Sequence, residues 1–113
     1  MATLFTKIIN GEIPSKTIYR DEHCVAIADV QPQAPHHVLI IPKKEITSIS
    51  SASQEDQTLL GHLLLVAGKV AEQLGVSQNG YRLVINTGKD GGQTVDHLHI
   101  HLLGGRHLEW PPG

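Results

Sequence analysis

The sequence predicts an α+β fold, in which a five-stranded, largely antiparallel sheet packs against one long helix, and a short helix lies near the N-terminus. One long stretch carries apolar residues at helical spacing, and five short stretches have the apolar composition of strands. The strands are not separated by helices, which argues against a parallel βαβ arrangement. The 113 residues fit a single domain, and we expect it to span 1–113.

The first part of the chain is expected to form the short helix and three strands. Thr3 is a suitable N-cap for the helix, and the turn at Asn10-Gly11 ends it. The apolar stripe of this helix consists of Leu4, Phe5, Ile8 and Ile9. Strands are predicted over 16–19, 24–28 and 38–41, and the last of them is a continuous apolar run that reads as a buried strand.

The long helix is predicted over 54–74. Ser53 can cap it, and Asp56 stands three residues later in the position of a capping box. The apolar face of the helix consists of Leu59, Leu60, Leu63, Leu64, Ala67, Val70, Ala71 and Leu74. Two further strands follow, over 81–85 and 95–103, and a glycine-rich loop joins them.

The composition excludes several classes of protein. Lys and Arg total 9 against 11 Asp and Glu, so the net charge of -2 excludes a generic basic surface for nucleic acid. The single cysteine, Cys24, excludes a disulfide framework and a zinc site built from several thiolates. No apolar run approaches the roughly 20 residues that span a bilayer, and the N-terminal segment lacks a signal-peptide core. We therefore expect a soluble, cytoplasmic protein that has neither nucleic acid nor a membrane as a partner.

Eight histidines are the most unusual feature of the composition, and three of them alternate in the last predicted strand. Because side chains alternate across a strand, His97, His99 and His101 should share one face, while the apolar residues between them face the core. Three interpretations remain open at this point: a solvated sheet face, a metal site that has His37 as a candidate further ligand, or a nucleophilic histidine flanked by two others.

The loop before the histidines, over 88–94, is rich in glycine. Glycines let backbone N–H groups approach an anion, although the spacing here matches neither a P-loop nor a dinucleotide-binding fingerprint. A simple hairpin turn is an equally good interpretation of the loop alone. Next to three alternating histidines, however, the loop favours a phosphate held beside a histidine, and thus the catalytic interpretation.

The segment 97–103, His-Leu-His-Ile-His-Leu-Leu, resembles the histidine-φ-histidine-φ-histidine-φ-φ motif of the histidine triad (HIT) family. The resemblance extends over nearly the whole chain and points to the nucleotide-binding, Hint-type branch of that family. It is carried by the segments 5–9, 12–14, 32–35, 41–44, 80–82, 91–93, 103–106 and 110–113, and by Asp29, His37 and Asn86.

The resemblance implies an enzyme that hydrolyses purine nucleoside phosphoramidates through a covalent nucleotidyl-histidine intermediate, without a cofactor or a metal. It also implies a homodimer in which two sheets join into one, and a purine nucleotide or nucleoside phosphoramidate as the ligand. A purine nucleotide-binding module with little turnover is the alternative, and a zinc protein is the third possibility.

Position by position, the resemblance assigns His99 as the nucleophile that attacks the α-phosphorus. The backbone carbonyl of His97 would accept the other ring N–H of His99 and so fix its tautomer. His101 and His37 would form a proton network toward the leaving amine. The hydroxyl of Thr94 would hydrogen-bond the leaving group.

A second group of residues would bind the nucleotide. Asp29 would accept hydrogen bonds from the ribose hydroxyls, and Trp110 belongs to a tail that in the family approaches the active site of the partner subunit. The expected nucleotide-binding residues are Phe5, Ile8, Ile27, Asp29, Asn86, Gly92, Gln93 and Trp110. The other four histidines, His23, His36, His62 and His107, are expected to be ordinary surface residues.

Overall fold

The computed structural model describes residues 2–113 and has the α+β architecture that the sequence predicts. Its helices are α1 (Leu4–Ile9) and α2 (Gln57–Gln73), with short 3-10 turns at Ile49–Ser51 and Gln54–Asp56 before α2. Its strands are β1 (Thr17–Arg20), β2 (Cys24–Ala28), β3 (His36–Pro42), β4 (Tyr81–Val84) and β5 (Ile100–Gly104). The five strands form one sheet in the order β1-β2-β3-β5-β4, and every neighbouring pair is antiparallel.

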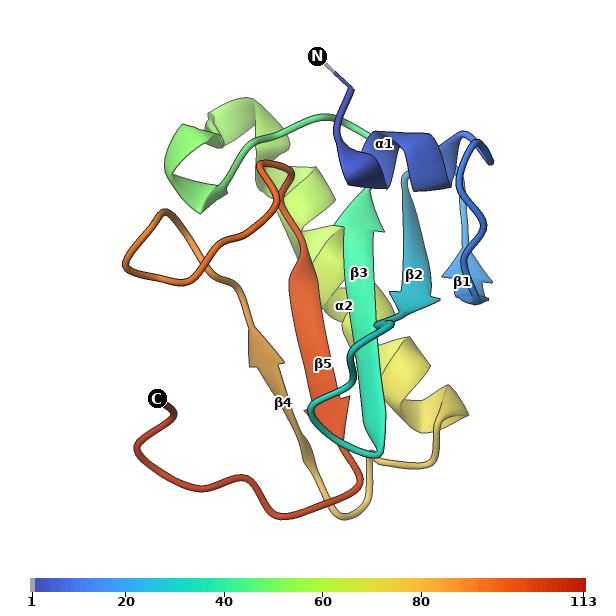
Figure 1. Cartoon of the computed structure of the whole chain (residues 1–113), viewed down its shortest axis with the longest axis vertical. Coiled ribbons are helices and arrows are strands. Elements are labelled where there is room, and N and C mark those ends of the chain that lie inside the picture. The colour runs from blue at the N-terminus through green and yellow to red at the C-terminus, as the bar shows by residue number, and fades with distance from the viewer. Residues whose placement is uncertain (1) are drawn as a thin grey trace.

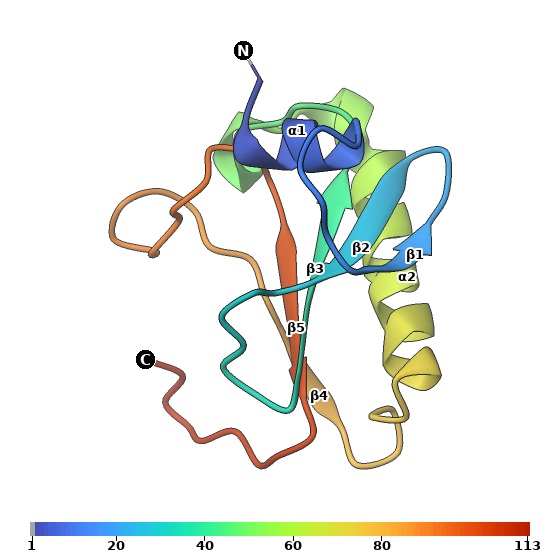
Figure 2. The ribbon, with the colours of Figure 1, turned by 45° about the vertical axis from the view of Figure 1, so that its right-hand side comes forward.

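The two helices lie on different sides of the sheet. The long helix α2 runs along one face, behind the sheet in Figure 1, whereas the short helix α1 crosses the end of β2 and β3 (Figures 1 and 2). Alternating residues of β2, β3 and β5 pack against α2, among them Ala26, Ile40 and Leu102. On the opposite face a smaller cluster joins Phe5 of α1 to Val25, Ile27, Leu39 and Ile41. Because α1 is short, it covers only part of this second face, and β5 remains open beside it.

Most predicted boundaries are confirmed to within a few residues. The Thr3 hydroxyl caps α1 by accepting a hydrogen bond from the backbone N–H of Thr6. Ser53 and Asp56 form the expected capping box, although it closes a 3-10 turn and the α-helix proper begins at Gln57. β3 is longer than predicted and includes His37, which therefore has a fixed position in the sheet.

The prediction of a last strand over 95–103 was wrong at its start, since β5 begins only at Ile100. The register pairs Ile40 with Ile100, so that Pro42 stands opposite Leu98. Proline has no N–H to donate, and the ladder stops there. The N–H of Leu98 donates instead to the carbonyl of Ile46, at 2.7 Å. The predicted alternation survives, because Leu98 is buried in the core under α2 while His99 lies on the other side.

The expectation that His62 is an ordinary surface residue was also wrong. Its Nε2 lies 2.7 Å from Oδ2 of Asp21, in the turn between β1 and β2. Asp21 also accepts hydrogen bonds from the Tyr19 hydroxyl and from the N–H groups of His23 and Cys24. Burial alone would raise the pKa of Asp21, but these hydrogen bonds hold it well below its ordinary value. The cluster thus fastens the β1–β2 turn to α2.

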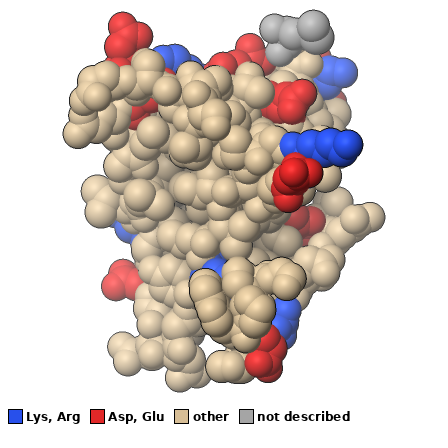
Figure 3. All heavy atoms as spheres, turned by 90° about the vertical axis from the view of Figure 1, so that its left-hand side faces the viewer, with Lys and Arg blue, Asp and Glu red and all other residues tan. Residues whose placement is uncertain are grey.

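The charged side chains do not gather into a patch on the face that lies to the left in Figure 1. Figure 3 shows acidic and basic residues there in separate small groups, with uncharged residues forming most of the surface. None of the helices within residues 2–113 is long and apolar enough to cross a membrane.

Candidate active site

A cavity of about 320 Å³ opens on the sheet face opposite α2, beside α1. It brings together residues of α1 and of the segment before β5 with residues of β2, β3 and β5. Those among them that the sequence predicts for the site are Phe5, Ile8, Ile27, Asp29, Thr94, His99 and His101. The cavity therefore combines an apolar wall, a carboxylate at one end and two imidazoles.

His99 is held in one tautomer by its own backbone. Its Nδ1 lies 2.7 Å from the carbonyl oxygen of His97. A carbonyl can only accept, so Nδ1 carries the proton and the lone pair remains on Nε2. The Phe5 ring packs edge-to-face on the imidazole, with 4.9 Å between centroids. Burial lowers the pKa of His99, which keeps the ring neutral and nucleophilic near pH 7.

His37 and His101 form a hydrogen-bonded pair whose protons can be assigned. The backbone N–H of Gln33 donates to Nδ1 of His37 at 3.0 Å, so in the neutral ring the proton of His37 is on Nε2. This Nε2 lies 2.9 Å from Nδ1 of His101, which must accept. The remaining nitrogen of His101, Nε2, then carries an N–H available to a ligand. The structure thus joins the two histidines by a hydrogen bond, and their role as a proton network remains a prediction.

The same pair is kept uncharged by its surroundings. Burial, together with the imidazoles of His99 and His37, lowers the pKa of His101 to about 4. Burial also lowers the pKa of His37, against the attraction of Asp29. The site therefore presents neutral imidazoles, with a lone pair on His99 and a donor N–H on His101.

Asp29 adds the carboxylate at the end of β2. Its Oδ2 lies 3.4 Å from Nε2 of His37, and its Oδ1 accepts the N–H of Gln31 at 2.8 Å. Ligand atoms of Asp29, His37 and His101 lie within 4.8 Å of one another, a spacing that a metal ion could bridge. Coordination through Nε2 of His37 would move its proton to Nδ1, where it would face the N–H of Gln33. The hydrogen bonds of this trio therefore suit a proton network better than a metal.

His97 does not reach the cavity with its side chain. The ring is fully buried, with Nε2 2.8 Å from the carbonyl of Pro42 and Nδ1 2.9 Å from the hydroxyl of Thr3. Of the three alternating histidines, two thus line the cavity, while the third contributes its backbone carbonyl to His99 and turns its ring toward α1.

Several predicted nucleotide-binding residues are not brought to this cavity. The Gln93 amide closes its own loop, donating to the carbonyls of Thr47 and Val95 at 2.7 and 3.0 Å and accepting the N–H of Gly88. Trp110 is 79% exposed on the C-terminal tail, where the Arg82 guanidinium lies 5.9 Å from its ring. The residues that line the cavity include none of Asn86, Gly92, Gln93 and Trp110.

The sequence interpretation missed five apolar residues of the wall, which are Leu4, Ala28, Val30, Leu39 and Val95. Leu39 had a usable signal, because it lies two residues after His37 and must share its face of the strand. It is also the register partner of His101. Val95 had the same signal, because within the predicted strand over 95–103 it lies two residues before His97 and would share the face of the histidines.

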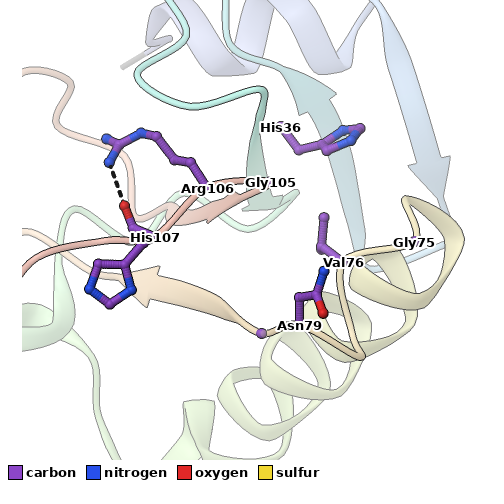
Figure 4. A pocket seen from close by; sticks show the side chains of 8 residues that line it. His36, Gly75, Val76, Asn79, Gly105, Arg106 and His107 are labelled. Carbon is purple, nitrogen blue, oxygen red and sulfur yellow. Dashed lines mark hydrogen bonds between the residues drawn. The ribbon is translucent and has the colours of Figure 1, made fainter.

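A second hollow, of about 510 Å³, lies at the end of the sheet far from α1. Its wall includes His36, Val76, Asn79, Arg106 and His107. Figure 4 shows that the Arg106 guanidinium and the His107 ring point away from Val76 and Asn79. The guanidinium is already bonded to the carbonyls of Gln33 and His107. This hollow therefore lacks the converging polar groups of a binding site.

We expect acid to destabilise the protein between pH 6.5 and about 4. His37, His99 and His101 have pKa values below the ordinary 6.5 in the folded protein, so the unfolded chain binds more protons in this range. Their contribution to stability is complete above pH 6.5 and is lost as the pH falls toward the folded pKa, about 4 for His101. Thermal unfolding midpoints from pH 7.5 to 4.5 measure the effect. His101→Gln should show a shallower decline, and equal slopes for both proteins would contradict the assignment.

Comparison with known proteins agrees with the sequence motif. The model of the HIT domain family matches residues 10–108. An uncharacterized HIT-like protein of Synechococcus elongatus is 59% identical over 111 residues, which is 98% of this chain and 96% of that protein. A HIT family hydrolase from Legionella pneumophila superposes with a TM-score of 0.97 at 49% identity, covering 99% of this chain and all of the other. A histidine triad nucleotide-binding protein from Candida albicans gives a TM-score of 0.83 at 33% identity, covering 97% of this chain and 83% of the other.

Proposed function

The chain belongs to the HIT domain family, and on that basis we propose that it hydrolyses the P–N bond of purine nucleoside phosphoramidates. One observation carries the proposal. The buried imidazole of His99 has its proton fixed on Nδ1 by the carbonyl of His97, and it presents a free Nε2 lone pair to a cavity that also contains the Asp29 carboxylate and apolar side chains. The names of its relatives support a hydrolase or a nucleotide-binding protein in general.

The reaction would proceed in two steps. Nε2 of His99 attacks the α-phosphorus, the new N–P bond forms, and the P–N bond to the leaving amine breaks. The leaving nitrogen takes up one proton, which enters from solvent and is passed on by the N–H of His101. Water then attacks the nucleotidyl-histidine, loses one proton to the same network and restores His99. The net products are a nucleoside monophosphate and an amine.

The walls of the cavity fit a nucleoside. The carboxylate of Asp29 is a good bidentate acceptor for the two ribose hydroxyls. Phe5, Ile8 and Ile27 supply an apolar slot for a flat base. The hydroxyl of Thr94 lines the same cavity and would hydrogen-bond the leaving group.

The test is single-turnover trapping of the intermediate. The protein is mixed with adenosine 5′-phosphoramidate, quenched with denaturant, and examined by intact mass and peptide mapping. We expect AMP and ammonia as products and a nucleotidyl group on His99. A nucleotide-binding module would bind AMP without forming an adduct, and a zinc enzyme would lose its turnover on chelation. Either result would contradict the proposed hydrolysis through a nucleotidyl-histidine.

We further propose that two chains form a homodimer, in which the tail with Trp110 lies near the active site of the partner. The high exposure of Trp110, at 79%, supports a contact outside its own chain. Light scattering should give a mass of twice 12.3 kDa. A species of 12.3 kDa at micromolar concentration would contradict the dimer.

A further inference from the structure

We infer that Thr3, at the N-terminus of α1, is a positioning residue for the nucleophile His99 and acts on it through His97. For its effect on turnover, this inference rests on the proposed function. Its effect on the rings of His97 and His99 does not, and can be measured without a substrate.

The ring of His97 is anchored at both nitrogens, although it lies outside the cavity. Nε2 faces the carbonyl of Pro42 at 2.8 Å, so this nitrogen must carry the proton. In the neutral ring Nδ1 is then an acceptor, and the Thr3 hydroxyl, 2.9 Å away, donates to it. The imidazole thus bridges α1 and the end of β3, at full burial.

No neighbouring hydroxyl can take over this bond. The Thr3 hydroxyl oxygen accepts a hydrogen bond from the N–H of Thr6 at 3.1 Å, and it donates its one hydrogen to Nδ1 of His97. The hydroxyl of Thr6 lies 3.2 Å from that of Thr3, but it donates to the carboxylate of Glu45. Removal of the Thr3 hydroxyl would therefore leave Nδ1 of a buried ring without a donor.

The anchored ring matters because the sheet does not hold this part of the chain. β5 starts at Ile100, so His97 and Leu98 lack the ladder that fixes the strand. Yet the carbonyl of His97 is the acceptor for Nδ1 of His99 at 2.7 Å. Phe5, two residues after Thr3, packs on both imidazoles, at 6.0 and 4.9 Å between centroids. Thr3 therefore helps to keep the carbonyl of His97 in the place that selects the tautomer of His99.

The experiment compares two substitutions of Thr3 with a packing control. Thr3→Ser keeps the donor and the cap, whereas Thr3→Val keeps the shape and loses both. Ile9→Ala loosens the same helix by removing part of the apolar cluster and leaves the Thr3–His97 contact untouched. If the valine variant does not fold, Thr3→Gly replaces it, because glycine is a tolerated helix cap without a hydroxyl.

We expect Thr3→Val to lower kcat by on the order of 10- to 100-fold, with little change in KM or in AMP affinity, because a small misplacement of the nucleophile is costly. Thr3→Ser should retain most of the parent kcat, and Ile9→Ala should lose thermal stability but not kcat. Long-range ¹H–¹⁵N spectra should show shifted ring signals of His97, whose Nδ1 has lost its donor, and of His99, in Thr3→Val alone.

The outcomes separate the two proposals. Unchanged ring signals of His97 and His99 in Thr3→Val, or an equal fall of kcat in Thr3→Val and Ile9→Ala, would overturn the positioning role. If the parent protein does not cleave adenosine phosphoramidate, the proposed function fails. The ring signals then still decide whether Thr3 positions His99.

Discussion

Replacement of His99 by glycine should reduce the turnover of adenosine 5′-phosphoramidate by about 10⁴-fold or more, as is typical when a nucleophile is removed. The loss is large because Nε2 of His99 is the attacking atom in the proposed reaction. No other imidazole offers a free lone pair to the cavity, because the lone pair of His101 accepts from His37 and the ring of His97 faces α1. The measurement is kcat/KM, which should fall by that factor, together with the yield of trapped nucleotidyl-protein, which should disappear while AMP still binds.

His107→Ala is the matched control for His99→Gly. His107 is exposed and lies in the hollow at the other end of the sheet. Its removal deletes an imidazole without touching the cavity, so turnover should stay within twofold of the parent. Turnover near the parent rate in His99→Gly, or an adduct that maps to another histidine, would show that His99 is not the nucleophile.

Substitution of either member of the His37–His101 pair should lower kcat by roughly 10²- to 10⁴-fold, the range expected for loss of a proton-transfer group. His101 supplies the donor N–H, and His37 determines which nitrogen of His101 carries it. Because the two rings act as one unit, the double variant His37→Phe/His101→Phe should be only slightly slower than the worse single variant. A double-mutant cycle of kcat measures this coupling.

His36→Ala is the control for this cycle, since it removes the histidine next to His37 in the chain. His36 is half-buried in the other hollow, and we expect its loss to leave kcat unchanged. If the effects of His37→Phe and His101→Phe multiply as independent changes, the two rings do not share a proton. A His37→Phe variant as active as the parent protein would remove His37 from the mechanism altogether.

The alternation of histidines made part of the site predictable from sequence. Period two alone separates His99 and His101 from Leu98 and Ile100, and the structure keeps this separation even where the strand is interrupted. The spacing of apolar residues also predicts that α2 and the sheet share one core. These features are local, and the chain needs only its own neighbours to determine them.

The features that sequence reasoning missed depend on distant partners. The start of β5 is fixed by Pro42, on another strand, and the ring of His97 is turned by Thr3, 94 positions away. Gln93 is one of the residues predicted to bind the nucleotide, but in the structure its amide donates to the carbonyls of Thr47 and Val95. A one-dimensional pattern tells which groups are available, and it does not tell which of them are already engaged by other parts of the fold.

The protonation pattern of the site is set by main-chain groups, and this limits how side-chain substitutions can alter it. The groups that fix the tautomers of His99 and His37 are a carbonyl and an amide of the main chain, those of His97 and Gln33. No side-chain replacement at positions 97 or 33 deletes either group directly, apart from proline at 33. The arrangement is therefore sensitive above all to the path of the backbone, which side chains such as Thr3 and His97 affect only by holding it in place. Anyone who wishes to transplant this chemistry onto another scaffold must copy the course of two loops, and not only a set of side chains.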